Sequence, residues 1–359
     1  MTLGSRFMLS RLLLALLLAT ALCAQSPTPP ATPAPPSDAQ TKIRVNSELV
    51  VLPVTVKNQF GELVPDLEQS DFRVFDENVE QSIDVFTAEA FPLSLVILID
   101  DDLKSKDAAQ MAPTLRAITA GISASDEAMV CRFDLDFYPG ESFSSDLDKL
   151  WTDLKNAQDH SSPSTSGPVP YVTSPTAHAE TVGEPKQTVA IKSGSRPTKA
   201  LDDAIHSAAT LLHDRGIARR KIILIVSDGV NGPQFNHSTY QDSLEALLHD
   251  NISVYSLAVG GNSPTKHKFS RLLNYSNDSG GDIYYASSSA NIEKLYSQIT
   301  EEARHEYTLA YVPRNLTNAA TYHKVEVRVN RPAVTVKTRQ GYYTGPAPTP
   351  AAAGSDRRR

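Results

Sequence analysis

The chain has 359 residues, of which 40% are hydrophobic and 21% are charged, a composition typical of a globular protein with a substantial core. Its formal net charge is −7. An acidic chain without a basic stripe argues against nucleic acid as a partner, because phosphate backbones are bound by clustered Lys and Arg.

The N-terminal segment, residues 1–24, has the features of a secretory signal. Arg6 and Arg11 supply positive charge, residues 12–18 are apolar, and Ala24 ends a small-residue cleavage site. The apolar run is shorter than the roughly 20 residues that span a bilayer, so we expect no transmembrane segment. We therefore expect cleavage after Ala24 and an exported protein, either periplasmic or secreted.

The rest of the chain divides by its hydrophobic pattern. Strand-like alternation at both ends flanks a middle part in which buried strands alternate with amphipathic helices. The predicted fold is a doubly wound, mainly parallel α/β sheet inserted in a small β-sandwich that both chain ends build. In the last part, two alternating strands are expected to pair across Asn330. The predicted segments are a Pro-rich linker (25–41), the first part of the sandwich (42–91), the α/β domain (92–305) with a flexible insertion (158–197), the second part of the sandwich (306–344) and a disordered tail (345–359).

Cysteine usage gives little chemistry. Cys131 is the only cysteine left after the predicted cleavage, so no internal disulfide can form. Its place in a predicted strand favours a small buried hydrophobe over a reactive nucleophile. The sequence also contains no Cys/His spacing typical of a metal site.

The main candidate site follows the apolar run at residues 93–99, which predicts a strand buried on both faces. The run ends at Asp100, Asp101 and Asp102, and open α/β sheets bind ligands just beyond the carboxyl ends of their strands. Three adjacent acids repel one another unless a cation or a positive side chain lies near. The simpler interpretation is a solvated acidic loop that caps a helix.

The order of the motifs resembles a von Willebrand factor type A domain. The resemblance rests on the strand end Ile99-Asp100, on Thr-x-Ala-Leu-x-Asp-Ala-Ile at residues 198–205 and on Val-Ser-Asp-Gly at residues 226–229. The flanks, which end in Gln-Gly-Tyr-Tyr at residues 340–343, are similar to exported acidobacterial proteins of the von Willebrand A-related type. The resemblance covers residues 43–343. It implies a non-enzymatic adhesion or scaffold module that binds another protein.

The resemblance also implies a metal-ion-dependent adhesion site for Mg²⁺ or Mn²⁺, in which an acidic side chain of the partner protein completes the coordination sphere. Hard cations of this kind prefer oxygen ligands. Carried over residue by residue, Asp100 and Asp228 match the two acids of the family. Asp102 stands where the family has a Ser, and Thr198 falls one residue before the position of the family's Thr.

Two lysines make this site degenerate. Lys104 stands where the family has a second Ser, and an ammonium cannot ligate a metal. Lys199 takes the aligned position of the Thr. Two alternatives therefore remain open: Asp100, Asp102, Thr198 and Asp228 hold the cation, or the lysines replace its charge.

An enzyme is the alternative class of function. Asp100 and Asp102 also resemble the Asp-x-Asp motif of haloacid-dehalogenase-like phosphatases, in which they would act as nucleophile and general acid with Mg²⁺. No Lys and paired-acid motif follows in the right context, and the β-rich flanks are foreign to that fold. An interaction module is therefore the main hypothesis, and the sequence does not identify its partner.

Overall fold

The computed structural model describes residues 49–103, 107, 115–159, 199–216, 218–260, 268–286, 289–314 and 321–345. All of these belong to one compact unit, Ser47–Arg359. The predicted signal and linker, the insertion from residue 160, and the tail after residue 345 lie outside the described residues, as do Lys104 and Thr198. The predicted domain boundaries stay predictions.

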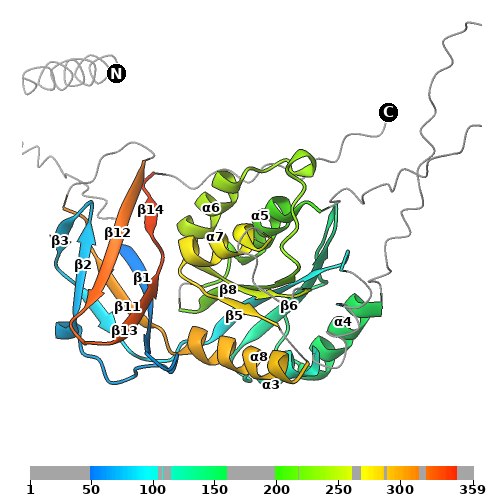
Figure 1. Ribbon diagram of the computed structural model, residues 1–359, viewed down its shortest axis with the longest axis horizontal. Coiled ribbons are helices and arrows are strands. Elements are labelled where there is room, and N and C mark those ends of the chain that lie inside the picture. The colour runs from blue at the N-terminus through cyan, green and yellow to red at the C-terminus, as the bar shows by residue number, and fades with distance from the viewer. Residues whose placement is uncertain are drawn as a thin grey trace, which may run out of the picture. The chain divides into compact units, whose positions relative to one another are not determined.

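The central sheet has the doubly wound order that the sequence predicts. Its strands are β5 (Leu93–Asp100), β6 (Glu127–Phe133), β7 (Phe137–Tyr138), β8 (Arg220–Ser227), β9 (Ile252–Ala258) and β10 (Ile283–Tyr285). They lie in the order β10-β9-β8-β5-β6-β7, and only the short edge strand β7 pairs antiparallel (Figure 1). The direction of winding reverses between the neighbours β5 and β8. That boundary is the topological switch point, where such sheets bind ligands.

Helices cover both faces of this sheet (Figure 1). One face carries α3 (Leu115–Ala120), α4 (Leu147–Asp159) and α8 (Ser289–Arg304), and the other carries α5 (Leu201–Leu212), α6 (Tyr240–His249) and α7 (Ser270–Ser279). All eight residues of β5 are buried, and its side chains alternate between the two apolar layers. This confirms the α/β fold class, because a strand buried on both faces needs a continuous apolar run. Cys131 packs in one layer as a buried free thiol, as predicted.

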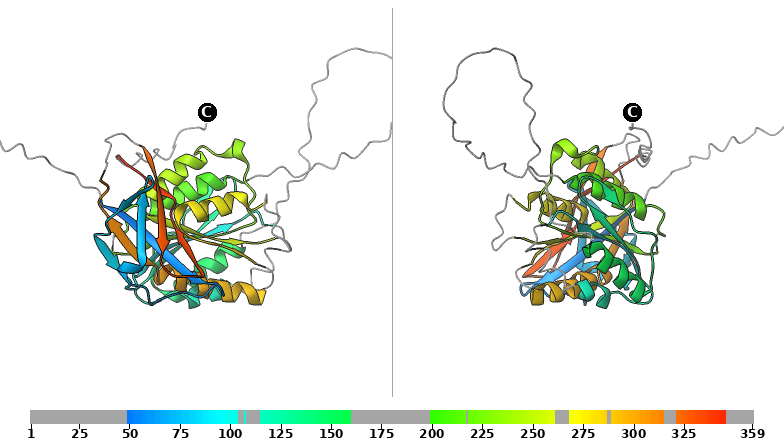
Figure 2. Two further views of the ribbon diagram at one scale, coloured as in Figure 1. Left: turned by 60° about the vertical axis from the view of Figure 1, so that its left-hand side comes forward. Right: turned by 90° about the vertical axis from the view of Figure 1, so that its right-hand side faces the viewer.

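Both ends of the described chain build two four-stranded antiparallel sheets that share one apolar core. Their strands are β1 (Val50–Asn58), β2 (Phe72–Asp76), β3 (Val79–Gln81), β4 (Val85–Thr87), β11 (Tyr307–Tyr311), β12 (Tyr322–Val329), β13 (Val334–Thr338) and β14 (Gly341–Tyr343). One sheet has the order β13-β1-β11-β4 and the other β14-β12-β2-β3. Blue and cyan strands therefore lie beside orange and red ones in Figure 2. The predicted sandwich from both chain ends is confirmed.

The predicted pairing across Asn330 is wrong. β12 lies between β2 and β14, whereas β13 pairs with β1 in the other sheet. The Asn330 amide donates to the carbonyl of Asp71 (2.8 Å), and Ala333 has φ +56°, so the segment crosses between the sheets. Alternation marks both strands as half-buried, but both sheets face the same core, so the pattern does not tell which sheet a strand joins.

Buried ion pairs connect the sandwich strands to the α/β part. Lys57 of β1 lies 2.9 Å from Asp282 and 2.8 Å from Glu302.

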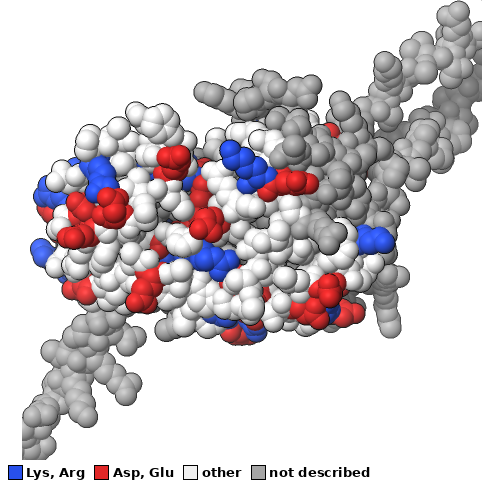
Figure 3. Space-filling view, turned by 90° about the horizontal axis from the view of Figure 1, so that it is seen from below, with Lys and Arg blue, Asp and Glu red and all other residues white. Residues whose placement is uncertain are grey.

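On the face shown in Figure 3, acidic and basic side chains of the described residues are interspersed and form no continuous basic stripe. Within the part of the chain that the structure describes, no helix is both long and apolar enough to cross a membrane.

Candidate functional site

The candidate site lies at the switch point, because parallel pairing brings the carboxyl ends of β5 and β8 together. Ile99 pairs with Val226, so Asp100 and Asp228 leave adjacent strands at the same edge. Lys199 stands before α5, and its backbone is held there. Its carbonyl accepts from the Gly232 amide (2.8 Å), and the following amide, that of Ala200, donates to the Asp134 carbonyl (2.8 Å).

The ammonium of Lys199 lies between the two acids. Its Nζ is 2.8 Å from Asp100 Oδ2 and 2.8 Å from Asp228 Oδ1. Ser227 Oγ donates to the same Asp100 oxygen at 2.6 Å. Asp100 is 0% exposed and Lys199 is 2% exposed, so this group of four side chains is closed off from solvent. We call Asp100, Lys199, Ser227 and Asp228 the switch-point cluster.

Burial governs the protonation of this cluster. It raises the pKa of Asp100 to about 6, with the ammonium of Lys199 acting against the rise and the Asp228 carboxylate adding to it. Burial also acts to lower the pKa of Lys199, but the two carboxylates outweigh it and hold that pKa above its usual value. Lys199 therefore carries its positive charge at neutral pH.

This arrangement does not fit a divalent cation between Asp100 and Asp228. Mg²⁺ binds oxygen ligands at about 2.0–2.1 Å, whereas an ammonium offers only donors. Two unit charges of like sign repel by about 4 kcal/mol at 4 Å when the effective dielectric constant is 20, and a divalent ion would meet more repulsion. Lys199 already supplies the positive charge that the acids need.

The other acids of the predicted site have different roles. The Asp102 amide donates to Asp100 Oδ1 (3.1 Å), so residue 102 helps to hold the first acid. Asp101 Oδ2 accepts from Arg132 of β6 at 2.5 Å. Lys104 and Thr198 lie outside the described residues, so their predicted roles in the site stay predictions.

Two participants were not among the predicted site residues. Ser227 was noted only within the Val-Ser-Asp-Gly motif, although its position at the strand end beside Asp100 could have indicated its role. Lys268 has no such signal: it comes after β9, and its Nζ lies 3.9 Å from Asp228 Oδ2 and donates to the Gly260 carbonyl (3.0 Å). Its side chain is 26% exposed, so it forms part of the rim above the buried cluster.

The structure also brings together three residues whose side chains could ligate a metal ion, a cluster that the sequence did not indicate. Asp76, Glu77 and His323 place ligand atoms within 4.8 Å of one another in the sandwich. Asp76 Oδ2 accepts from the hydroxyls of Tyr311 (3.0 Å) and Tyr342 (2.9 Å). Pairing of β2 with β12 makes this group, and these residues are far apart in the chain.

The chain matches no known family profile and no curated protein. Among solved structures it is similar to a von Willebrand factor type A protein from Catenulispora acidiphila, at 10% identity and TM-score 0.41, over 84% of this chain and 75% of that one. It is also similar to manganese-loaded TRAP protein from Plasmodium vivax, at 10% identity and TM-score 0.40, over 77% of this chain and 100% of that one. A third is BatB from Bacteroides thetaiotaomicron, at 12% identity and TM-score 0.39, over 59% and 98%.

Similarity at this level transfers no ligand, partner or activity to this chain. The sheet order of the described residues is the doubly wound, mainly parallel one that the sequence predicts. The acidobacterial grouping stays a prediction.

Proposed function

We propose that the protein is an exported, non-enzymatic interaction module, an adhesion or scaffold protein in which Lys199 takes the place of the metal ion. The observation that carries the proposal is the 2.8 Å contact of Lys199 Nζ with both Asp100 and Asp228. It lies where α/β sheets bind ligands, yet the acids are neutralised from within. The cluster then joins β5, β8 and the start of α5, and it fixes the loops that form the edge of the sheet.

The same geometry counts against the phosphatase alternative. A nucleophilic carboxylate has to reach phosphorus, and Asp100 is 0% exposed with Oδ2 accepting from Lys199 and Ser227. We therefore propose that the loop rim, and not the buried acids, meets the partner. Lys268 is the rim cation nearest to Asp228 among the described residues. An acidic side chain of a partner protein would pair with it directly, where a family member would use its metal.

Site-specific photo-cross-linking of the mature protein tests this proposal in a cell-envelope extract of the source organism. The cross-linker is placed at Val230, beside the cluster, and as a matched control at the exposed Val79 of β3. We expect a discrete protein adduct at Val230 only, and Lys268→Glu should abolish it by charge reversal. Equal adducts at both positions, or an adduct that Lys268→Glu leaves unchanged, would overturn the proposal.

A further inference from the structure

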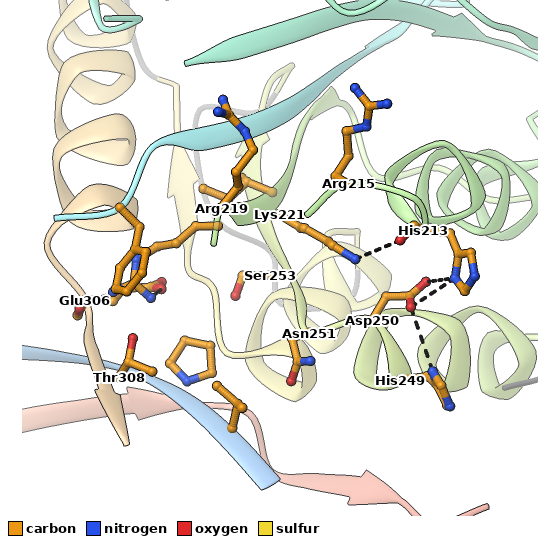
Figure 4. Close-up of a pocket in the computed structure, with 15 residues that line it drawn as sticks. His213, Arg215, Arg219, Lys221, His249, Asp250, Asn251, Ser253, Glu306 and Thr308 are labelled. Carbon is orange, nitrogen blue, oxygen red and sulfur yellow. Dashed lines mark hydrogen bonds and ion pairs between the residues drawn. The ribbon is translucent and has the colours of Figure 1, made fainter. Parts of the chain in front are cut away.

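A cavity of about 390 Å³ lies at the opposite edge of the central sheet, where β8 and β9 begin (Figure 4). The sandwich strands β1 and β11 close it from the other side. Its apolar wall consists of Val51, Pro53, Phe91 and Ile222. Ligand pockets typically measure about 300–1,000 Å³ and combine such walls with a few polar groups, so this cavity suits a small ligand.

Lys221 is the cation of this cavity that makes no direct ion pair with a described carboxylate. The residue is 9% exposed, and its Nζ donates to the carbonyl of His213 at 3.0 Å. No carboxylate of the described residues lies within 4.0 Å of that nitrogen. Burial lowers the pKa of Lys221, because water no longer stabilises the ammonium. A buried charge is costly unless it is paired.

The carboxylates that line the cavity already have cationic or imidazole partners. Asp250 Oδ2 lies 2.8 Å from His213 Nδ1, and Asp250 Oδ1 lies 3.8 Å from His249 Nδ1. Glu306 Oε2 accepts from Arg220 Nη1 at 3.1 Å. Neither carboxylate lies within 4.0 Å of Lys221 Nζ, although Asp250 and Asp214 lie near enough to act against the lowering of the Lys221 pKa.

The remaining two arginines are directed elsewhere. The guanidinium groups of Arg215 and Arg219 point away from the other labelled side chains in Figure 4. Arg219 Nη2 donates to the carbonyls of Leu93 (2.6 Å) and Ser125 (2.9 Å), and Arg215 Nη1 donates to Glu127 (3.3 Å). The cavity therefore combines an apolar wall with one buried ammonium that makes no direct ion pair with a carboxylate of the described residues.

We propose that this cavity binds a small organic monocarboxylate with an apolar body. The carboxylate pairs with Lys221 Nζ, and the body packs against Val51, Pro53, Phe91 and Ile222. A ligand in this position touches both the sandwich and the α/β part. This inference does not rest on the proposed function, because the cavity and the switch-point cluster lie at opposite edges of the sheet.

Matched probes separate the charge from the apolar body. Hexanoate and its neutral counterpart hexan-1-ol are titrated separately into the ¹⁵N-labelled mature protein while amide shifts are followed by NMR. We expect hexanoate to shift amides lining the cavity, including Lys221, Ser253 and Thr308, and to bind at least about tenfold tighter than hexan-1-ol. Lys221→Met should remove this preference. Lys149→Met, at an exposed lysine of α4, should keep it.

Thermal unfolding of each variant serves as the control that distinguishes a loss of binding from a loss of the folded structure. Lys221→Met should melt at the same or a higher temperature than the native protein, because it removes a buried ammonium that makes no direct ion pair. If it fails to fold, Lys221→Gln serves instead, since its neutral amide keeps a hydrogen-bond donor on that side chain. The proposal is overturned if about 10 mM hexanoate shifts no cavity amide. Preference for hexanoate that survives in the neutral variant would overturn it as well.

Discussion

Lys199 adds a polar link between β5, β8 and α5, which already meet through strand pairing and apolar packing. Asp100 ends β5, Asp228 follows β8, and Lys199 precedes α5, yet all three meet within 2.8 Å contacts. A buried ammonium and a buried carboxylate each cost free energy alone, and removing one partner of such a pair typically costs about 3–5 kcal/mol. The cluster therefore acts as a support for the loops around it.

The titration of Asp100 tests the burial of this cluster. Its pKa rises from 3.8 to about 6, chiefly through burial. Because the folded-state pKa exceeds the unfolded one, this group contributes stability that is present below about pH 4 and lost as the pH rises through about 6. We expect ¹³C NMR of the Asp100 carboxyl to show a midpoint near pH 6, and Lys199→Met to move it higher by removing the ammonium. A midpoint at or below pH 4 in the native protein would contradict the buried arrangement.

At the scale of the elements, the strands of the central sheet could be predicted from the sequence. The neighbours of each strand could be predicted only in part. The apolar runs of β5 and β8 show buried strands, and the switch-point rule places Asp100 and Asp228 together. The identity of the cation between them stayed open, because sequence spacing does not show where the Lys199 side chain points. The predicted pairing of two strands across Asn330 was wrong, because the strands of both sheets show the same alternating pattern toward a shared core.

The end of α7 shows how a glycine sets a helix boundary. The helix ends at Ser279, and the next residue, Gly280, has φ +90°. A Cβ at Gly280 would also lie 2.6 Å from the Arg339 amide nitrogen. We expect Gly280→Ala to lower the free energy of unfolding in urea by at least about 1–3 kcal/mol.

Gly216 is the matched control for this change. It has no positive φ and no atom within 4 Å of an added Cβ. Gly216→Ala should change the free energy of unfolding by no more than about 0.5 kcal/mol. Similar losses in both variants would show that the left-handed cap does not matter.

The whole molecule depends on both chain ends. Removing the sandwich would leave Asp282 and Glu302 without Lys57, and Arg220 without Glu306. We expect a chain trimmed to residues 92–304 to aggregate in size-exclusion chromatography, whereas removal of residues 346–359 should be tolerated. A trimmed chain that stays monomeric and unfolds cooperatively at the native temperature would disprove this dependence.

The predicted export is also tested on the whole chain. The positive charge and apolar run before Ala24 predict removal of residues 1–24. Mass spectrometry of the protein recovered from the periplasm or medium should find Gln25 as the first residue. An intact Met1, or an acylated Cys23, would refute the predicted cleavage.

The most direct measurement of the central claim is Mn²⁺ titration of the mature protein, followed by electron paramagnetic resonance. If Lys199 replaces the metal ion, the native protein should bind no Mn²⁺ at the switch-point cluster up to about 1 mM. Lys199→Thr removes the ammonium and supplies a hydroxyl, so binding should appear, and a further Asp228→Asn change should abolish it. Mn²⁺ bound by Asp76, Glu77 and His323 would be unaffected by Asp228→Asn. Binding by the native protein that Asp228→Asn abolishes would contradict the account.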